Sequence, residues 1–354
     1  MSRLVVHVGP PTTATSDFQQ ALFANADVLA AHGVYLPTSA RLELAPNSVC
    51  HHHLAWDLAG SPRFRPDIGG WDALEAEIAD VEADTVLLSS ELLSPGIFSE
   101  GIEHRLDERL AALGRDVTIL YVVNEQLSLI NSSYTQKVKT LTDVAGFAAY
   151  AAGVLRRSEG DLERLTGRWQ RSTDLAFVAV PVTRLNSPNP LVALLRAAEV
   201  SVPEEDLVVG PESATISLGP VAVEAMRLLR VYLHGLNRTL SHDDIAVRRL
   251  HRIAARQAKD AGWCETPYWG WPPALAARAA EQFEPSNERF AQDVWQCPWP
   301  LPLPVDIPPA HVQLLQLEAD ELERVHEYIF TLTKRYTAIR SGKRNPGMTS
   351  PEPV

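Results

Sequence analysis

The chain has 354 residues, of which 45% are hydrophobic, so it can bury one large core or two modest ones. Its formal net charge of −12 argues against a nucleic-acid binder or a protein attracted to anionic membranes, because long-range attraction to phosphate has the wrong sign. No run of about 18 apolar residues occurs, and no charged segment followed by an apolar stretch opens the chain. The three cysteines lack a Cys-x-x-Cys spacing and cannot all pair, which favours a reducing compartment. We therefore expect a cytoplasmic protein with no membrane insertion.

Strand and helix patterns alternate over the first half of the chain, as a parallel α/β sheet requires. Apolar segments predict strands at residues 3–8, 84–89, 116–123 and 175–181. Amphipathic segments predict helices at residues 15–32, 71–82, 102–113, 126–140, 161–171 and 191–199. The expected fold class is α/β, with a parallel sheet flanked by helices.

The composition shifts towards Pro, Glu, Ser and Gly around residues 200–220, and mostly helical sequence follows. Periodicity predicts further helices at residues 221–236, 243–261 and 310–335. We place a soft boundary near residue 200. It separates an α/β core (1–200) from a helical, Trp-rich region that continues the same domain (201–340) and a disordered tail (341–354).

Two features of the second half admit either a structural or a binding role. Arg248, Arg252 and Arg256 fall on one face of a predicted helix, which is either a solvated surface or part of an anionic acceptor site. The tryptophan-rich segment 263–271 either caps the core or lines the site of a sugar or flat acceptor, because tryptophan offers a large rigid face.

A pattern typical of phosphate binding lies near the N-terminus, where an apolar strand runs through Gly9 into a loop and a helix. The loop and the helix start are small or hydroxyl-bearing at Thr12, Thr13, Ala14, Thr15 and Ser16. Backbone N–H groups and the helix dipole can bind an anion whatever the side chains are. The Walker pattern G-x-x-x-x-G-K-[ST] fails, because Ala14 replaces its second glycine and Thr15 its lysine. A plain strand-to-helix turn with a Ser/Thr N-cap is therefore the alternative.

The segment from His7 to Gln19 resembles the start of the bacterial P-loop sulfotransferases, whose pattern is roughly H-[IV]-G-x-x-K-T-G-T-[ST]-x-[LF]-Q. Two further blocks follow in the order that the family has. Residues 86–91 form a predicted strand that ends in Ser89-Ser90-Glu91, and residues 117–139 carry a second strand and an S-x-Y-x-Q motif that begins at Ser132.

This resemblance implies a P-loop NTPase-like sheet with a mostly helical C-terminal half. It also implies a sulfotransferase that takes its sulfuryl group from 3′-phosphoadenosine 5′-phosphosulfate (PAPS) and needs no metal. The residues that the resemblance places at the donor are Gly9, Thr12, Thr13, Ala14, Thr15, Ser16, Ser89, Asn124 and Ser132.

Two of these positions lack the cation that the family uses. Thr12 stands where a loop lysine contacts the sulfuryl bridge and the 5′-phosphate, and Asn124 stands where an arginine holds the 3′-phosphate. A hydrogen bond to a charged group is worth about 1.5–3 kcal/mol, so the two losses together cost on the order of 3–6 kcal/mol of binding free energy. Either other cations replace them, for instance Lys137, Lys139 or Arg184, or the protein has lost transfer activity and serves as a binding or partner protein.

Sulfuryl transfer also needs a base that deprotonates the acceptor hydroxyl or amine. Glu91 follows a strand at the edge where open α/β sheets bind ligands, and is one candidate. The run His51-His52-His53 matches a histidine-containing segment of the family, and histidine exchanges protons near neutral pH, which makes His52 and His53 the others. We predict no metal site, because neighbouring histidines of the run point apart and no carboxylate or cysteine ligand set accompanies them.

The sequence does not choose the acceptor, which is a carbohydrate, a lipid-linked sugar or a small phenolic metabolite, and it does not indicate an oligomeric state. A hydrolase is disfavoured because no G-x-S-x-G motif surrounds a serine. An NTPase or another phosphate-using transferase is disfavoured because the loop lysine and a Walker-B-like acid are absent.

Overall fold

The structure is a computed structural model that describes residues 3–11, 15–41, 48–94, 100–142, 145–185, 189–209, 216–236, 245–311 and 316–341. The chain forms two compact units. The first comprises Met1–Glu125, Gly160–Ser213 and Phe283–Pro302, and the second comprises Gln126–Glu159, Ala214–Gln282 and Leu303–Val354. The units therefore alternate along the chain, whereas the sequence suggested a single boundary near residue 200.

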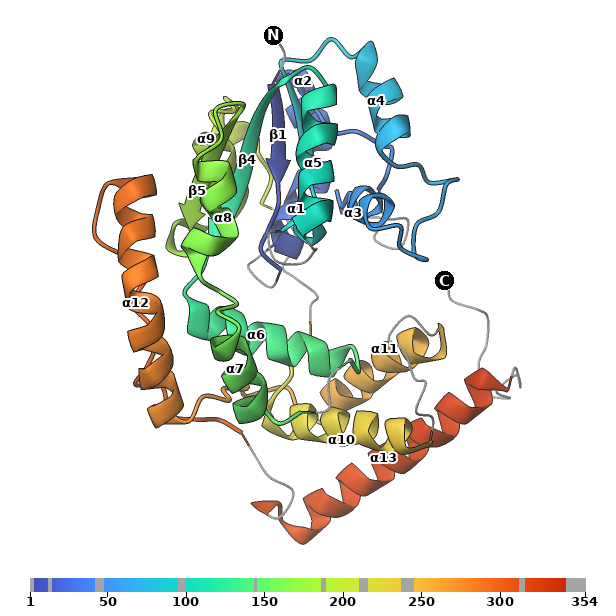
Figure 1. Cartoon of the computed structure of the whole chain (residues 1–354). Coiled ribbons are helices and arrows are strands. Elements are labelled where there is room, and N and C mark those ends of the chain that lie inside the picture. The colour runs from blue at the N-terminus through green and yellow to red at the C-terminus, as the bar shows by residue number, and fades with distance from the viewer. Residues whose placement is uncertain are drawn as a thin grey trace. The chain divides into compact units, whose positions relative to one another are not determined.

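A five-stranded sheet forms the centre of the first unit (Figure 1). Its strands are β1 (Arg3–His7), β2 (Val34–Tyr35), β3 (Thr85–Ser89), β4 (Asp116–Val123) and β5 (Leu175–Pro181). They are all parallel and lie in the order β2-β3-β1-β4-β5. The predicted α/β class with a helix-flanked parallel sheet is confirmed, and the short strand β2 adds to the predicted strands.

Helices cover both faces of this sheet, because side chains alternate along each strand and both sets are apolar. Val5 packs on the face covered by α1 (Thr15–Ala24), α2 (Ala26–Ala31) and α9 (Pro190–Ala197). Leu4 and Val6 pack on the opposite face. The helices that bury that face are α3 (His52–Leu58), α4 (Trp71–Ala79), α5 (Glu100–Ala112), α8 (Leu162–Gln170) and the end of α12 (Pro273–Trp295).

The helix predicted over residues 15–32 is in fact two helices, α1 and α2, separated at Asn25. The Asn25 side chain is fully buried and its amide donates to the carbonyls of Ala21 (2.8 Å) and Val208 (2.9 Å). Its Oδ1 accepts from the backbone N–H of Val208 (2.7 Å). A side chain that binds backbone groups in this way competes with helical hydrogen bonds, which explains the break.

The second unit is helical. Its helices are α6 (Gln126–Lys139), α7 (Phe147–Arg156), α10 (Pro220–Leu236), α11 (Ile245–Asp260), the start of α12, and α13 (Ala319–Arg340). The last helix thus begins later than the predicted residue 310 and ends later than residue 335. The predicted disordered tail lies almost entirely outside the described residues, which end at Ser341.

The tryptophan-rich segment is packed inside the second unit. Trp271 is 0% exposed, and its indole N–H donates to the carbonyl of Leu127 (2.9 Å). The backbone N–H of Gly270 donates to Asn131 Oδ1 (2.9 Å), and Phe147 packs edge-on against Trp271. The alternative in which this segment caps a core therefore describes these residues better than an open platform for a flat acceptor.

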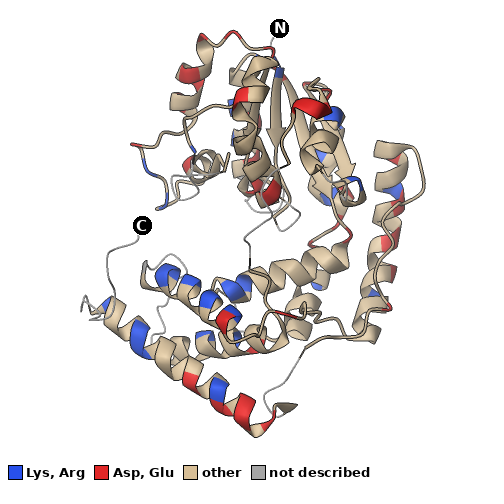
Figure 2. Cartoon of the chain, turned by 180° about the vertical axis from the view of Figure 1, so that it is seen from behind, with Lys and Arg blue, Asp and Glu red and all other residues tan. Residues whose placement is uncertain are grey.

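Basic residues gather on α11 (Figure 2). Arg248, Arg252 and Arg256 are exposed, as one helical face requires, whereas Leu250 and Ala254 on the other face are buried. The expected basic face is therefore present. Within the described residues, no helix combines the length and the apolar composition that a bilayer crossing requires.

Candidate functional site

The candidate site lies where the chain leaves β1 and β3, the two neighbouring strands at the centre of the sheet. β1 leads into α1 on one face of the sheet, and β3 leads through the short 3₁₀ helix η1 (Glu91–Leu93) to α5 on the other face. Where adjacent parallel strands send their helices to opposite faces, a crevice opens at their carboxyl ends, and open α/β sheets bind ligands there. The Gly9 loop and Ser89-Ser90-Glu91 both lie at this edge.

Gly9 is packed directly against Glu91. Its φ of +92° favours glycine, and a Cβ added there would lie 2.9 Å from the Cβ and 3.1 Å from the Cα of Glu91. The carbonyl of Gly9 accepts from the N–H of Val122 (2.8 Å), and the carbonyl of His7 accepts from the N–H of Ser90 (2.9 Å). The start of the loop is therefore fixed between the ends of β3 and β4.

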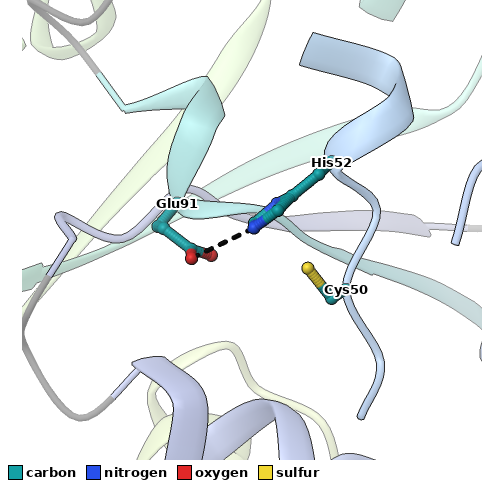
Figure 3. Close-up of side chains that lie close together, drawn as sticks. All are labelled: Cys50, His52 and Glu91. Carbon is teal, nitrogen blue, oxygen red and sulfur yellow. Dashed lines mark ion pairs between the residues drawn. The ribbon is translucent and has the colours of Figure 1, made fainter. Parts of the chain in front are cut away.

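Glu91 and His52 contact one another at this edge (Figure 3), and the contact is an ion pair when the imidazole is protonated. The distance from His52 Nε2 to Glu91 Oε1 is 3.2 Å, and the two side chains are 12% and 20% exposed, so solvent reaches the pair. The other imidazole nitrogen, Nδ1, lies 2.9 Å from Ser90 Oγ. Gln19 Nε2 donates to the second carboxylate oxygen of Glu91 (2.9 Å). The pair is therefore oriented from α1, from α3 and from the end of β3.

The carboxyl group of Glu91 is strongly acidic. Burial alone would raise its pKa, but the charge and hydrogen bond of His52, together with hydrogen bonds from the Glu91 backbone and Gln19, lower the pKa to about 2. Glu91 is therefore a carboxylate at neutral pH and accepts a proton only at a large cost in free energy. This favours His52 over Glu91 as the base of the pair.

Two further histidines, His7 and His51, are fully buried against Ser89 and are neutral. His7 Nδ1 lies 2.8 Å from Ser89 Oγ, which also accepts from Gln19 Nε2 (3.2 Å). His51 Nδ1 accepts from the N–H of Ser89 (3.2 Å), so its Nε2–H donates to the carbonyl of Pro37 (3.1 Å). Burial lowers the pKa of His7 and that of His51 to about 4. Both rings, and the predicted donor residue Ser89, support the backbone around the site.

The histidine run thus divides into different roles. His52 is the member that contacts Glu91, whereas His53 is 1% exposed and packs edge-on against Trp56, with ring centroids 5.0 Å apart. A buried ring among aromatic side chains is typical of a packing role. Of the candidate bases, His52 and Glu91 are brought together and His53 is not part of their pair.

The predicted donor residues are distributed unevenly. Thr12, Thr13 and Ala14 lie outside the described residues. Thr15 is buried and its hydroxyl donates to the carbonyl of Pro10 (3.1 Å), whereas Ser16 is exposed in the first turn of α1. The loop therefore offers Ser16 to solvent and uses Thr15 internally.

The more distant donor residues belong to different units. Asn124 directly follows β4 in the first unit, and its Oδ1 accepts from the N–H of Glu125 (2.9 Å). Ser132 lies on α6 in the second unit, where its carbonyl accepts from the hydroxyl of Thr135 (2.9 Å). Their roles at a donor stay predictions.

The replacement cations that the sequence suggested also differ in their surroundings. Lys139 Nζ donates to the carbonyl of Ile216 (2.8 Å), and Lys137 lies over the ring of Tyr150, 4.9 Å from its centroid, both within the second unit. Arg184 is exposed on the 3₁₀ helix η2 (Val182–Leu185), which follows the carboxyl end of β5. Arg184 is therefore the one of the three that belongs to the same unit as this edge of the sheet.

Cys50 joins the Glu91–His52 pair and was missed by the sequence analysis. Its sulfur, the His52 imidazole and the Glu91 carboxylate each offer one ligand atom, and these atoms all lie within 4.8 Å of one another. The thiol is 3% exposed, and burial raises its pKa. The premise that no cysteine or carboxylate accompanies the histidine run is therefore wrong, because the fold brings Glu91 to Cys50 and His52. The Cys-x-His spacing was the available signal.

No family model matches the chain, and neither the curated proteins nor the solved structures contain a match. The features that bear on function are the geometry of Cys50, His52 and Glu91, their position at the carboxyl ends of the strands, and the short motifs that resemble the sulfotransferases.

The Gly9–Glu91 contact predicts a large cost for adding one methyl group. Gly9→Ala combines a left-handed backbone with a clash, whereas Gly114 also has a positive φ (+62°) but open space around its Cβ. We expect Gly114→Ala to lower the free energy of unfolding by about 1–2 kcal/mol and Gly9→Ala by about 1–3 kcal/mol more. Urea unfolding of the two variants measures the difference. Equal costs would show that the loop moves away from Glu91 without penalty.

His7 and His51, two buried histidines with a lowered pKa, predict a loss of stability in mild acid. Each has a pKa near 6.5 when unfolded and about 4 when folded, so the unfolded chain binds more protons between these values. Stability is therefore fully present above pH 6.5 and is lost as the pH falls towards 4. We expect a loss of about 2 kcal/mol per histidine between pH 7.5 and pH 5.0, measured by urea unfolding. His51→Asn should remove about half of this loss; an unchanged pH profile in that variant would contradict the assignment.

Proposed function

We propose that this chain is a sulfotransferase-like protein that transfers a sulfuryl group from PAPS to a hydroxyl or amine of a carbohydrate or small metabolite. The observation that carries the proposal is the acid–base pair of Glu91 and His52 beside the Gly9 loop, at the carboxyl ends of β1 and β3. A glycine loop between the first, central strand and α1 also fits a P-loop NTPase-like sheet, which is the architecture implied by the motif resemblance.

In this proposal His52 is the base and Glu91 is the residue that orients it. The acceptor oxygen forms a bond to the sulfur of PAPS while the bond from sulfur to the bridging phosphate oxygen breaks, which releases adenosine 3′,5′-bisphosphate. The acceptor proton passes to His52 Nδ1, directly or through the hydroxyl of Ser90 that lies 2.9 Å away. Glu91, held as a carboxylate, stabilises the resulting imidazolium at Nε2.

The donor phosphates would bind to backbone N–H groups at the start of α1, with Ser16 as an exposed hydroxyl there. Arg184, at the same edge of the sheet, is our candidate for part of the lost positive charge. A guanidinium suits this task because it can bind two phosphate oxygens at once.

A second candidate function is a binding or partner protein that keeps the fold without transfer. Two observations favour it. Asn124 has no charge to offer and its Oδ1 accepts the hydrogen bond of the next backbone N–H, and the Glu91 carboxylate repels an anion that approaches the Gly9 loop. Titration with the product nucleotide separates the two candidates.

Calorimetric titration with adenosine 3′,5′-bisphosphate at moderate salt is the direct test. Micromolar binding supports the transferase, and the absence of binding at millimolar nucleotide supports the partner protein. We expect Thr12→Lys combined with Asn124→Arg to tighten binding by on the order of 100- to 10,000-fold, because both cations return to the site. Thr337→Lys, on the exposed side of α13, controls for one added positive charge away from the loop and should leave the affinity unchanged.

His52→Ala should slow sulfuryl transfer from labelled PAPS to a phenolic acceptor by about 100- to 10,000-fold, the usual contribution of a general base. The affinity for adenosine 3′,5′-bisphosphate should stay within about twofold, because the imidazole contacts the acceptor rather than the nucleotide. His104→Ala on the exposed surface of α5 is the matched control. Unchanged turnover in His52→Ala would dismiss this residue as the base.

A further inference from the structure

We infer that Cys50, His52 and Glu91 form a binding site for Zn²⁺. A thiol, an imidazole and a carboxylate, each from a different position in the chain, present ligand atoms within 4.8 Å of one another. Figure 3 shows the Cys50 sulfur directed towards the His52–Glu91 pair. This inference uses only the ligand geometry and does not depend on the proposed sulfuryl transfer.

The distances suit a tetrahedral ion. Zinc binds imidazole nitrogen and carboxylate oxygen at about 2.0 Å, so two such ligands in a tetrahedron are about 3.3 Å apart. His52 Nε2 and Glu91 Oε1 are 3.2 Å apart. A thiolate at about 2.3 Å from zinc would lie about 3.6 Å from the other two ligand atoms. The sulfur therefore needs to move inwards by only about 1 Å, within reach of a small side-chain rotation.

The hydrogen bonds that His52 and Glu91 make to other residues are of the kind that orients metal ligands in proteins. A histidine that binds zinc normally donates its other ring N–H to a neighbouring oxygen, which orients the ring and fixes its tautomer. Ser90 Oγ lies 2.9 Å from His52 Nδ1 and can accept that hydrogen. Gln19 Nε2 donates to Glu91 Oε2 and leaves Oε1 for the ion. Two of the three ligands are thus already oriented.

The ligand chemistry selects the metal. Magnesium and calcium prefer sets of oxygen ligands, whereas a thiolate combined with imidazole and carboxylate suits zinc. Three protein ligands leave a fourth position for water or another ligand, as in catalytic rather than structural zinc sites. The partial exposure of His52 (12%) and Glu91 (20%) gives solvent access to that position.

Zinc binding and base catalysis by His52 exclude one another. On binding, the Cys50 thiol releases its proton to solvent and forms a sulfur–zinc bond, and His52 Nε2 exchanges its contact with Glu91 for the ion. The metal-free site keeps the contact between His52 Nε2 and Glu91 that the proposed transfer uses. Zinc would therefore act on this site as an inhibitor of proton transfer.

The test is a zinc titration of the full chain after removal of metal by a chelator, in competition with a chromophoric chelator. We expect one equivalent of Zn²⁺ per chain. Cys50→Ser and Glu91→Gln should each weaken binding by more than about 100-fold, beyond the 10- to 100-fold cost of losing an outer contact. Cys297→Ser removes another free thiol of the same unit and should bind zinc as the unchanged protein does.

Cobalt(II) gives a second readout. Bound to the unchanged protein, it should show thiolate-to-metal absorption in the near ultraviolet, absent in Cys50→Ser. Failure of the unchanged protein to bind one equivalent, a cobalt spectrum without the sulfur band, or equal zinc affinity in Cys50→Ser would each overturn the site. The zinc stoichiometry and the cobalt spectrum of the unchanged protein test the site even if a variant fails to fold. Nucleotide titration of the metal-free chain tests sulfuryl transfer separately.

Discussion

Hydrogen bonding of β1 on both of its edges is the constraint on which the first unit depends. In the parallel register His7 lies level with Ser89 of β3 and with Leu120 of β4. Two residues further along, the backbone of Gly9 therefore meets the residues that follow β3, and it packs onto Glu91. A shift of one residue in this register would turn every β1 side chain to the other face and separate the loop from Glu91.

The chemistry at the carboxyl ends of β1 and β3 follows from the negative charge of Glu91 and the partners that stabilise it. A partly buried carboxylate needs partners, and Glu91 obtains them from His52 and Gln19. These partners lower the pKa of Glu91 and so make it a weak base. The same contacts orient His52 and place its imidazole next to a negative charge. The two deeper histidines, His7 and His51, stay neutral and connect β1 and the segment before α3 to Ser89. The buried polar groups around Ser89 thus include the acid–base pair and two neutral imidazole rings.

Much of the fold could be predicted from the sequence because most strands and helices have a local pattern of apolar and polar residues. Four continuous apolar segments gave the long strands, but β2 has only two residues and carries no periodicity. The break at Asn25 depends on Val208, which lies 183 residues away, so no local pattern could reveal it. The two interleaved units also depend on contacts between distant segments, so a single shift in composition could not predict them.

The site was only partly predictable. Motif order indicated Gly9 and Glu91, and the histidine run indicated His52 and His53, but adjacent histidines differ only in the direction of their side chains, which the start of α3 decides. Cys50 and His52 are close in sequence, whereas Glu91 reaches them through a sheet whose register no single sequence states. The sequence states which residue types are present, whereas the tertiary structure determines the distances between their side chains.

The alternation of the two units also has a consequence for synthesis. Phe290 and Leu301, which come from the third segment of the first unit, are buried in the core on one face of its sheet. When the ribosome has released the five strands, this face still lacks those side chains, and the intervening residues 214–282 belong to the other unit. Roughly a hundred further residues, about 5–20 seconds of synthesis, separate the last strand from these side chains, and during this time a chaperone can bind the apolar face.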